Sequence, residues 1–485
     1  MKKTLISSVI IFLLSIFASQ CFTQSVSPAA APTQDQYAQN IEQLFFYIQN
    51  YYVDDVDPQK LYEGAIRGML ESLDDPHSTY LDKNAWRSMT DITVGNFGGV
   101  GLSITKEAVS TPEKPAYVKV ASPIENSPGY KAGIKSGDLI VAIEGVDTST
   151  ITMEEVLGKL RGTVGESVTI TIRRKGRQDF DVTLVRAIIE NPTVKFTMIG
   201  STGYIQLTEF GAKSALKFQE ALDSFKAQNY KGLIIDLRNN GGGLLSAAVQ
   251  IADMFMDEGL IVSTKSRLSF ENTAYYAQRK NTIVKNLPVV ILVNGNSASA
   301  SEVLTAALKD SKKAYVVGTK TYGKGSVQIP RQLLNNDGFK ITVAKHYSPD
   351  DVNIDKVGIT PDMEIKFHEL TEDEAKVLES LLDSKVIEDY VDKNEDMTEA
   401  QIADYAEILC KKYKLEKSLL RKLIRNETDK VKPSRLYDLD YDVQLNAALK
   451  IINDGNFNQL MEKTVSLKQA EEKRKAEESN KALEK

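Results

Sequence analysis

Apolar positions change their spacing along the chain and divide it into four regions. In residues 37–80 they recur every three or four residues, as at Ile41, Leu44 and Ile48, which predicts amphipathic helices ending in a turn at 74–80. From about 95 to 187 apolar and polar residues alternate and glycines mark the turns. This pattern predicts short strands, a short helix near 153–160 and a β-hairpin, and therefore a small β-rich module.

In the third region, from about residue 195 to 366, buried apolar runs alternate with amphipathic segments. The expected strands are 203–207, 232–237, 289–293 and 314–317, and the expected helices are 212–227, 244–256 and 300–309. This βαβ rhythm predicts a layered α/β core. From about 370 the spacing is helical again. After Leu467 the chain is mostly Lys, Glu and Ala, which is typical of solvated helix or disorder.

Composition and the N-terminus indicate an exported protein with folded cores. The chain has 485 residues, 42% of them apolar, and a net charge of −6 without a basic patch, so we expect no nucleic-acid partner. Lys2 and Lys3 precede an apolar run that is short for a membrane span, which predicts a signal peptide in residues 1–21 and then a linker in 22–36. We expect the protein in the periplasm or cell envelope of a bacterium.

Two alternatives at the N-terminus stay open. The apolar run could remain as an uncleaved anchor, or Cys21 could be lipidated, although Gln20 is bulky for a lipidation motif. Either would attach the protein to a membrane. Cys21 and Cys410, so placed, provide neither a disulfide framework nor a metal site, and we expect no metal or cofactor.

The first candidate for chemistry is Ser299, which lies between an expected strand and an expected helix. The free N–H groups and partial positive charge of a helix N-terminus favour a developing oxyanion, and the N–H of Ala300 would be one donor. The alternative is structural, because Ser299 with Glu302 three residues later also forms a capping box.

Lys324 is the candidate base, because only three histidines are present in the chain. A neutral lysine can activate a serine, provided that its ordinary pKa of about 10.4 is lowered by burial. No acidic residue lies between 316 and 328, and Gln328 could hold the amine without raising its pKa. A solvated loop cation is the alternative, and His346 or His368 leaves a histidine-based triad open. His77 is expected in a surface turn.

Residues 236–243 place three glycines between a buried strand and a helix. Such a loop can form a nest of backbone N–H groups, so we expect Gly242 or Gly243 to supply the second oxyanion donor. A phosphate-binding P-loop is not indicated, because no lysine and hydroxyl residue follow. Asp236 and Arg238 are expected to brace the turn.

Together these segments resemble the carboxyl-terminal processing proteases, which are tail-specific PDZ serine peptidases. The resemblance covers about residues 37–366 and is carried by 73–80, 98–102, 127–140, 236–243, 297–302, Lys324 with Gln328, and 358–362. It implies Ser299 as nucleophile, Lys324 as general base and Gln328 as the residue that orients it. Gly241 stands where the family often has proline, which leaves the identity of the oxyanion glycine open.

The resemblance also implies that the β-rich module is a PDZ-like domain that binds peptide tails. The loop before Leu102 would present N–H groups to a terminal carboxylate, and an edge strand would accept the peptide by β-augmentation. The expected peptide-binding residues are Gly98, Gly99, Val100, Gly101, Leu102 and Ile104. The partners would be proteins or peptides with free C-terminal tails.

The predicted fold class is a multidomain α+β protein. We expect an N-terminal helical region (37–90), an inserted PDZ-like domain (91–187), an α/β layered serine protease core (188–368), and a C-terminal helical region with a charged tail (369–485). The predicted function is a serine endopeptidase with a Ser–Lys dyad that cleaves near the C-terminus of exported proteins. The alternative is a non-catalytic PDZ adaptor or scaffold on a protease-like core.

Overall fold

The computed structural model describes residues 32–94, 96–107, 109–111, 115–174, 176–190, 192–367, 370–394, 396–429 and 435–483. The predicted signal peptide, Cys21 and His368 lie outside these ranges. The chain forms two compact units, Met1–Ser72 and Leu73–Lys485.

The described part of the first unit consists of two helices, α2 (Gln34–Tyr51) and α3 (Pro58–Glu71). Thr33 and Gln36 form a capping box at the start of α2, and Asp57 caps α3 ahead of Pro58. Helix α2 therefore begins inside the segment expected to be a linker. Within the described ranges no helix is long and apolar enough to cross a membrane.

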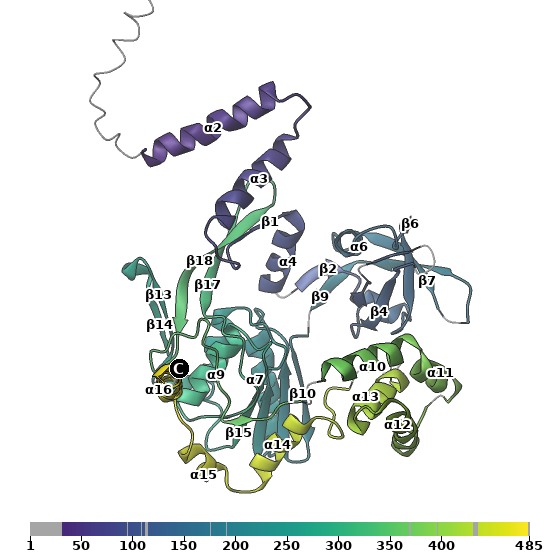
Figure 1. The fold of residues 1–485 in the computed structure, drawn as a ribbon, viewed down its shortest axis with the longest axis vertical. Coiled ribbons are helices and arrows are strands. Elements are labelled where there is room, and N and C mark those ends of the chain that lie inside the picture. The colour runs from purple at the N-terminus through teal and green to yellow at the C-terminus, as the bar shows by residue number, and fades with distance from the viewer. Residues whose placement is uncertain are drawn as a thin grey trace, which may run out of the picture. The chain divides into compact units, whose positions relative to one another are not determined.

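A six-stranded sheet forms the centre of the second unit (Figure 1). Its strand order is β10 (Val194–Ile199), β11 (Thr202–Leu207), β12 (Gly232–Asp236), β15 (Val289–Val293), β16 (Tyr315–Gly318) and β19 (Met363–Glu364). All neighbouring pairs are parallel except β10 with β11. Strands β12 and β15 are buried at every position, as expected for parallel strands that are covered on both faces.

Different parts of the chain cover the two faces of this sheet. One face packs against α7 (Ser214–Ala227), α8 (Leu245–Asp253) and α9 (Ala300–Asp310), in a cluster that includes the fully buried Phe218. The other face packs against α14 (Val443–Asn453) and α15 (Phe457–Glu462), through residues such as Leu445. Residues 443–462 therefore complete the hydrophobic core around this sheet.

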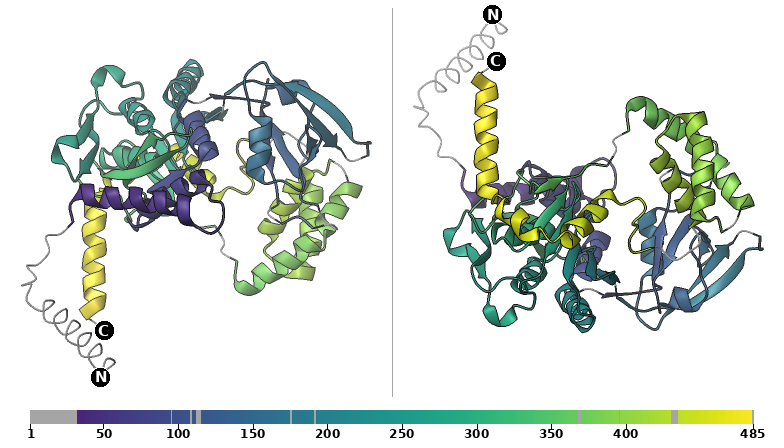
Figure 2. Two further views of the ribbon diagram at one scale, coloured as in Figure 1. Left: turned by 90° about the horizontal axis from the view of Figure 1, so that it is seen from above. Right: turned by 90° about the horizontal axis from the view of Figure 1, so that it is seen from below.

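The remaining C-terminal helices form a cluster of their own, which Figure 2 shows in green. They are α10 (Glu372–Asp383), α11 (Val386–Lys393), α12 (Glu399–Tyr413) and α13 (Lys417–Thr428). The last helix, α16 (Leu467–Leu483), packs its first residue, Leu467, beside Ala306 of α9.

A second, antiparallel sheet consists of strands that were not among those expected from the sequence. It consists of β1 (Thr79–Leu81), β18 (Gly338–Tyr347), β13 (Leu260–Ser266) and β14 (Thr273–Tyr276), with β17 (Ser326–Gln332) paired to β18. Two short 3₁₀ helices, η1 (Ser269–Glu271) and η2 (Arg279–Asn281), flank β14. Because β17 starts two residues after Lys324, this sheet fixes the loop that holds the candidate base.

The β-rich module is built as expected, with its own core. Its strands are β3 (Leu102–Thr105), β4 (Val118–Pro123), β5 (Leu139–Ile143), β7 (Ser167–Arg173) and β8 (Phe180–Val185), with β6 (Val146–Asp147) beside β5. Two helices, α5 (Pro128–Lys131) and α6 (Met153–Leu160), complete it. Helix α4 (Lys83–Val94) precedes the module. Strand β2 (Asn96–Gly99) at the start of the module pairs with β9 (Ala187–Glu190) after its last strand, and the two form an antiparallel ribbon. The predicted fold class is confirmed.

Candidate active site

Ser299 occupies a strained position between β15 and α9. Its φ of 55° and ψ of −115° lie where residues with a side chain rarely occur, and such strain is often found at functional sites. The neighbouring Ser297 and Ser301 are fully buried, and their hydroxyls donate to the carbonyls of Leu237 (2.8 Å) and Asn240 (2.9 Å). Ser299 is half-buried, so of the three serines it is the one whose side chain is accessible.

The carboxylate of Glu302 joins the Ser299 turn to the loop that carries Lys324. Glu302 is fully buried, and one of its oxygens accepts the N–H groups of both Ser299 (2.9 Å) and Lys324 (2.8 Å). Its other oxygen accepts the N–H of Gly323 (2.7 Å) and the hydroxyl of Thr321. Burial raises the pKa of Glu302, while these hydrogen bonds act in the opposite direction.

This shared acceptor limits the separation of the two candidate catalytic residues. The backbone nitrogens of Ser299 and Lys324 donate to the same Glu302 oxygen, so the distance between these nitrogens cannot exceed the sum of the two hydrogen-bond lengths. A second link, from the N–H of Tyr322 to the carbonyl of Ser297 (3.0 Å), joins the same loops. The lysine side chain is long enough to bring its amine to the Ser299 hydroxyl from this distance.

The surroundings of Lys324 favour its neutral form. Burial lowers the pKa of Lys324, and the charge of Lys340 lowers it further, whereas Asp75 and Glu302 act to raise it. The net shift is downward. In the ranges that the structure covers, no carboxylate forms an ion pair with the Lys324 amine.

Gln328 belongs to a chain of polar contacts beside this loop. Its amide nitrogen donates to the hydroxyl of Thr342 (3.2 Å), which in turn donates to Asp75 (2.6 Å). Asp75 also accepts the hydroxyl of Ser78 (2.6 Å). Neither Asp75 nor Glu302 is among the catalytic residues expected from the sequence. Residues 73–80 form a recognisable motif, but only the pairing of β1 with β18 brings this turn to Thr342.

The glycine loop lies directly against Ser299. A Cβ atom added to Gly242 would be 2.8 Å from the Cβ of Ser299 and 3.0 Å from the nitrogen of Ala300. The N–H of Gly242 itself donates to the Asn240 side chain (2.8 Å). Its use there favours Gly243 as the second oxyanion donor beside Ala300, whose N–H at the first position of α9 has no acceptor within the helix.

The histidines offer a less suitable base. His346 lies in β18, and burial together with the charge of Lys324 lowers its pKa to about 4. Its Nδ1 is buried without a hydrogen-bond partner among the described residues, whereas a triad histidine is held by a carboxylate at this atom. The backbone N–H of His77 donates to Asp75 within the turn.

The expected peptide-binding residues fall in two elements of the β-rich module. Gly98 and Gly99 lie in β2 and pair with β9, whereas Leu102 and Ile104 lie in β3. Val100 and Gly101 form the turn between these strands. The carbonyls of this turn accept hydrogen bonds from residues 124–129, and among the described residues β3 is an edge strand that pairs within the sheet only with β4.

Comparisons with known proteins agree with this architecture. The chain matches sequence models of peptidase family S41 (residues 201–365), of a PDZ domain (119–174) and of the N-terminal domain of the activating protease CtpB (16–85). A carboxy-terminal-processing protease of Bartonella bacilliformis is 36% identical over 370 residues, which cover 75% of this chain and 83% of the relative. The carboxy-terminal processing protease CtpA of Bacillus subtilis is 32% identical over 358 residues, covering 74% and 75%.

Among solved structures, a photosystem II D1 C-terminal processing protease is similar, with 30% identity, coverage of 69% of this chain and 94% of that one, and a TM-score of 0.41. The identity to the Bartonella protein extends over most of both chains. The chain therefore belongs to peptidase family S41, as a PDZ-containing carboxy-terminal processing protease.

Proposed function

We propose that the protein is an endopeptidase in which Ser299 is the nucleophile and Lys324 the general base, and that it cleaves near the C-terminus of exported proteins. The observation that carries this proposal is the buried Glu302 oxygen, which accepts the N–H groups of both residues. It supports a fixed pairing of one accessible hydroxyl with one amine of lowered pKa.

In the proposed reaction, the neutral Lys324 amine takes the proton of the Ser299 hydroxyl as the oxygen attacks the scissile carbonyl. The oxyanion of the tetrahedral intermediate accepts hydrogen bonds from the N–H groups of Ala300 and Gly243. Loss of one such donor typically costs about 3 kcal/mol in the barrier. The Lys324 ammonium then protonates the leaving amine, and, neutral again, activates the water that hydrolyses the acyl-enzyme.

Gln328 orients the amine in this proposal. Its NH₂ group is bonded to Thr342, which leaves its carbonyl oxygen as an uncharged acceptor for Lys324. A carboxylate at this position would instead raise the pKa of Lys324 and weaken it as a base.

The PDZ-like module would capture the substrate tail along the free edge of β3, with Leu102 and Ile104 contacting its apolar side chains. Both side chains are half-buried against the core of the module. Export through a signal peptide in residues 1–21 would bring the enzyme to such substrates in the periplasm or cell envelope. An uncleaved or lipidated N-terminus would attach it to the membrane there.

The test compares cleavage of an unstructured peptide with a free C-terminus by the wild type, Ser299→Ala and Lys324→Ala. Both variants should lose cleavage while keeping the wild-type melting curve. Lys320→Ala, which removes an exposed lysine of the same loop, should cleave normally. A fluorophosphonate probe should label Ser299, as located by mass spectrometry. Cleavage by Lys324→Ala at neutral pH, or labelling of another serine, would contradict the dyad.

A further inference from the structure

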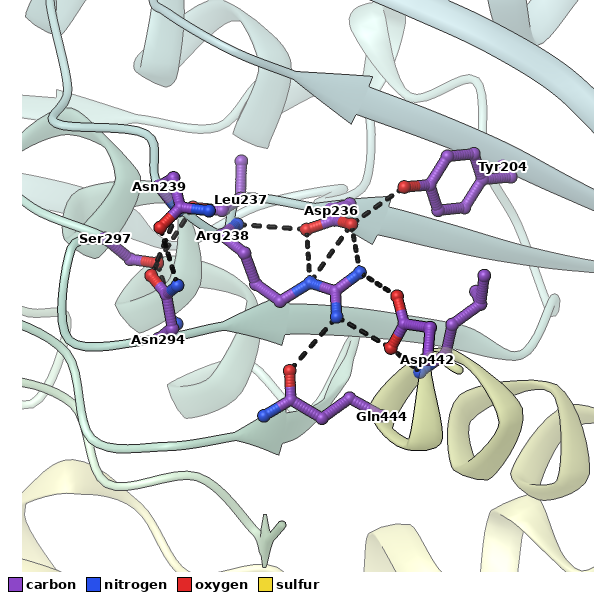
Figure 3. A network of polar contacts seen from close by, with 10 residues as sticks. Tyr204, Asp236, Leu237, Arg238, Asn239, Asn294, Ser297, Asp442 and Gln444 are labelled. Atoms are coloured by element: carbon purple, nitrogen blue, oxygen red, sulfur yellow. Dashed lines mark hydrogen bonds and ion pairs between the residues drawn. The ribbon is translucent and has the colours of Figure 1, made fainter. Parts of the chain in front are cut away.

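The guanidinium of Arg238 connects the candidate oxyanion loop to the C-terminal helix α14 (Figure 3). On one side it bonds Asp236 at the end of β12, through Nε (2.9 Å) and Nη2 (2.6 Å). On the other side it bonds Asp442, the N-cap of α14, through Nη1 (2.8 Å) and Nη2 (2.6 Å). Nη1 also donates to the Gln444 side chain (3.1 Å).

This arrangement uses all five N–H donors of an arginine and leaves little freedom for its side chain. Arg238 is 12% exposed, and its hydrogen bonds to Asp236 and Asp442 raise its pKa against the effect of burial. The acceptors are held in turn. The hydroxyl of Tyr204 donates to Asp236 (2.7 Å), and the amide of Gln444 donates to the carbonyl of Ile365 (2.7 Å).

The arginine is also the start of the loop that lies against Ser299. Its own N–H donates to Asp236 (3.0 Å), and two residues later the Asn240 side chain accepts the N–H of Gly242. The carbonyl of Asn240 accepts the N–H of Ala298 (3.0 Å) on the nucleophile turn. A displacement of Arg238 would therefore be transmitted over four residues to the glycines beside Ser299.

We infer that Asp442 and Gln444 are positioning residues for catalysis: they hold Arg238, and through it they hold the oxyanion loop in its working position. The C-terminal helix α14 thus takes part in the active site without touching substrate. This inference rests on the proposed role of the Gly243 N–H as an oxyanion donor. Oxyanion donors stabilise the transition state, so loss of Asp442 or Gln444 should lower kcat and the rate of serine acylation, whereas KM should change little.

Asp442→Asn is the sharpest variant, because asparagine caps a helix as well as aspartate does and can still accept the N–H of Leu445 (2.9 Å in the native chain). Only the charge and one of the two oxygens facing Arg238 are removed. The matched control is Asp440→Asn, two residues earlier in the same segment, whose carboxylate bonds Arg425 (2.7 Å) and not Arg238.

We expect Asp442→Asn to lower kcat per titrated active site by about tenfold with KM within about twofold of the wild type, and Asp440→Asn to leave both unchanged. Gln444→Ala should lower kcat by a smaller factor. Arg238→Ala should lower it more, and adding Asp442→Asn to Arg238→Ala should have no further effect, since the carboxylate acts through the arginine. A wild-type kcat in Asp442→Asn, or additive losses in the double variant, would overturn the inference.

If Asp442→Asn fails to fold, the test is made with Gln444→Ala instead: a lowered kcat per active site supports the inference, and a wild-type kcat overturns it. Labelling by the fluorophosphonate probe separates this inference from the proposed function. Slower labelling of Ser299 in Asp442→Asn supports the inference, and equal rates in the two proteins overturn it alone. If Ser299 of the wild type is not labelled at all, the proposed function itself fails and the inference with it.

Discussion

Replacement of Glu302 by glutamine tests the link between the two candidate catalytic loops. The amide keeps one acceptor oxygen, but its NH₂ group then faces two of the four native donors, so two hydrogen bonds are lost. Hydrogen bonds to a charged group contribute about 1.5–3 kcal/mol each, which gives a loss of about 3–6 kcal/mol. Removal of a buried charge offsets part of it, as the raised pKa of Glu302 indicates. We expect a net loss of about 3 kcal/mol.

If that free energy holds Ser299 and Lys324 together, kcat should fall by about two orders of magnitude, since about 1.4 kcal/mol corresponds to a factor of ten. The assay is steady-state cleavage of an unstructured peptide, with active sites counted by the fluorophosphonate probe and stability measured by urea unfolding. Glu220→Gln, on the exposed side of α7, is the control and should change neither quantity. A kcat within threefold of the wild type in Glu302→Gln would refute the reasoning.

Three further outcomes are expected. Lys340→Gln should raise the pKa of Lys324 and so move the acid limb of the kcat/KM profile to higher pH, because the base must be neutral. Asp75→Asn should lower that pKa and move the acid limb to lower pH. Shifts in the same direction for the two variants would contradict Lys324 as the base. Gly318→Ala should destabilise the fold by about 3 kcal/mol in urea unfolding, because a Cβ there would lie 1.9 Å from a carbonyl oxygen at a φ of 134°. Phe218→Ala should cost about 3–5 kcal/mol by the same measurement, since the ring is fully buried.

The elements that the sequence predicted well have strong local patterns. The strand at 289–293 coincides with β15, because it is an unbroken run of apolar residues, and the helix near 153–160 coincides with α6, because its apolar positions keep helical spacing. The second sheet was not predicted as a unit. Strands such as β18 mix half-buried and buried positions without a clear alternation, and their pairing depends on segments far apart in the chain.

The candidate site shows the same division. Ser299 and Lys324 could be chosen from residue type and local context, because a turn of small residues between a strand and a helix and a lysine between glycines are visible in the sequence. The role of Glu302 in joining the two loops could not be predicted in this way. In the sequence Glu302 is typical of a helix-capping residue, and only the folded Lys324 loop provides the further donors to its buried carboxylate. The contact of Arg238 with Asp442 joins residues 204 positions apart, and no local pattern signals it.

The packing of α14 and α15 on the central sheet has a consequence for biosynthesis. When the ribosome has just added Glu364 of β19, every strand of that sheet has been synthesised, yet the helices that cover one of its faces begin only at Val443. The nascent chain therefore lacks one layer of its hydrophobic core until residues 443–462 have been synthesised.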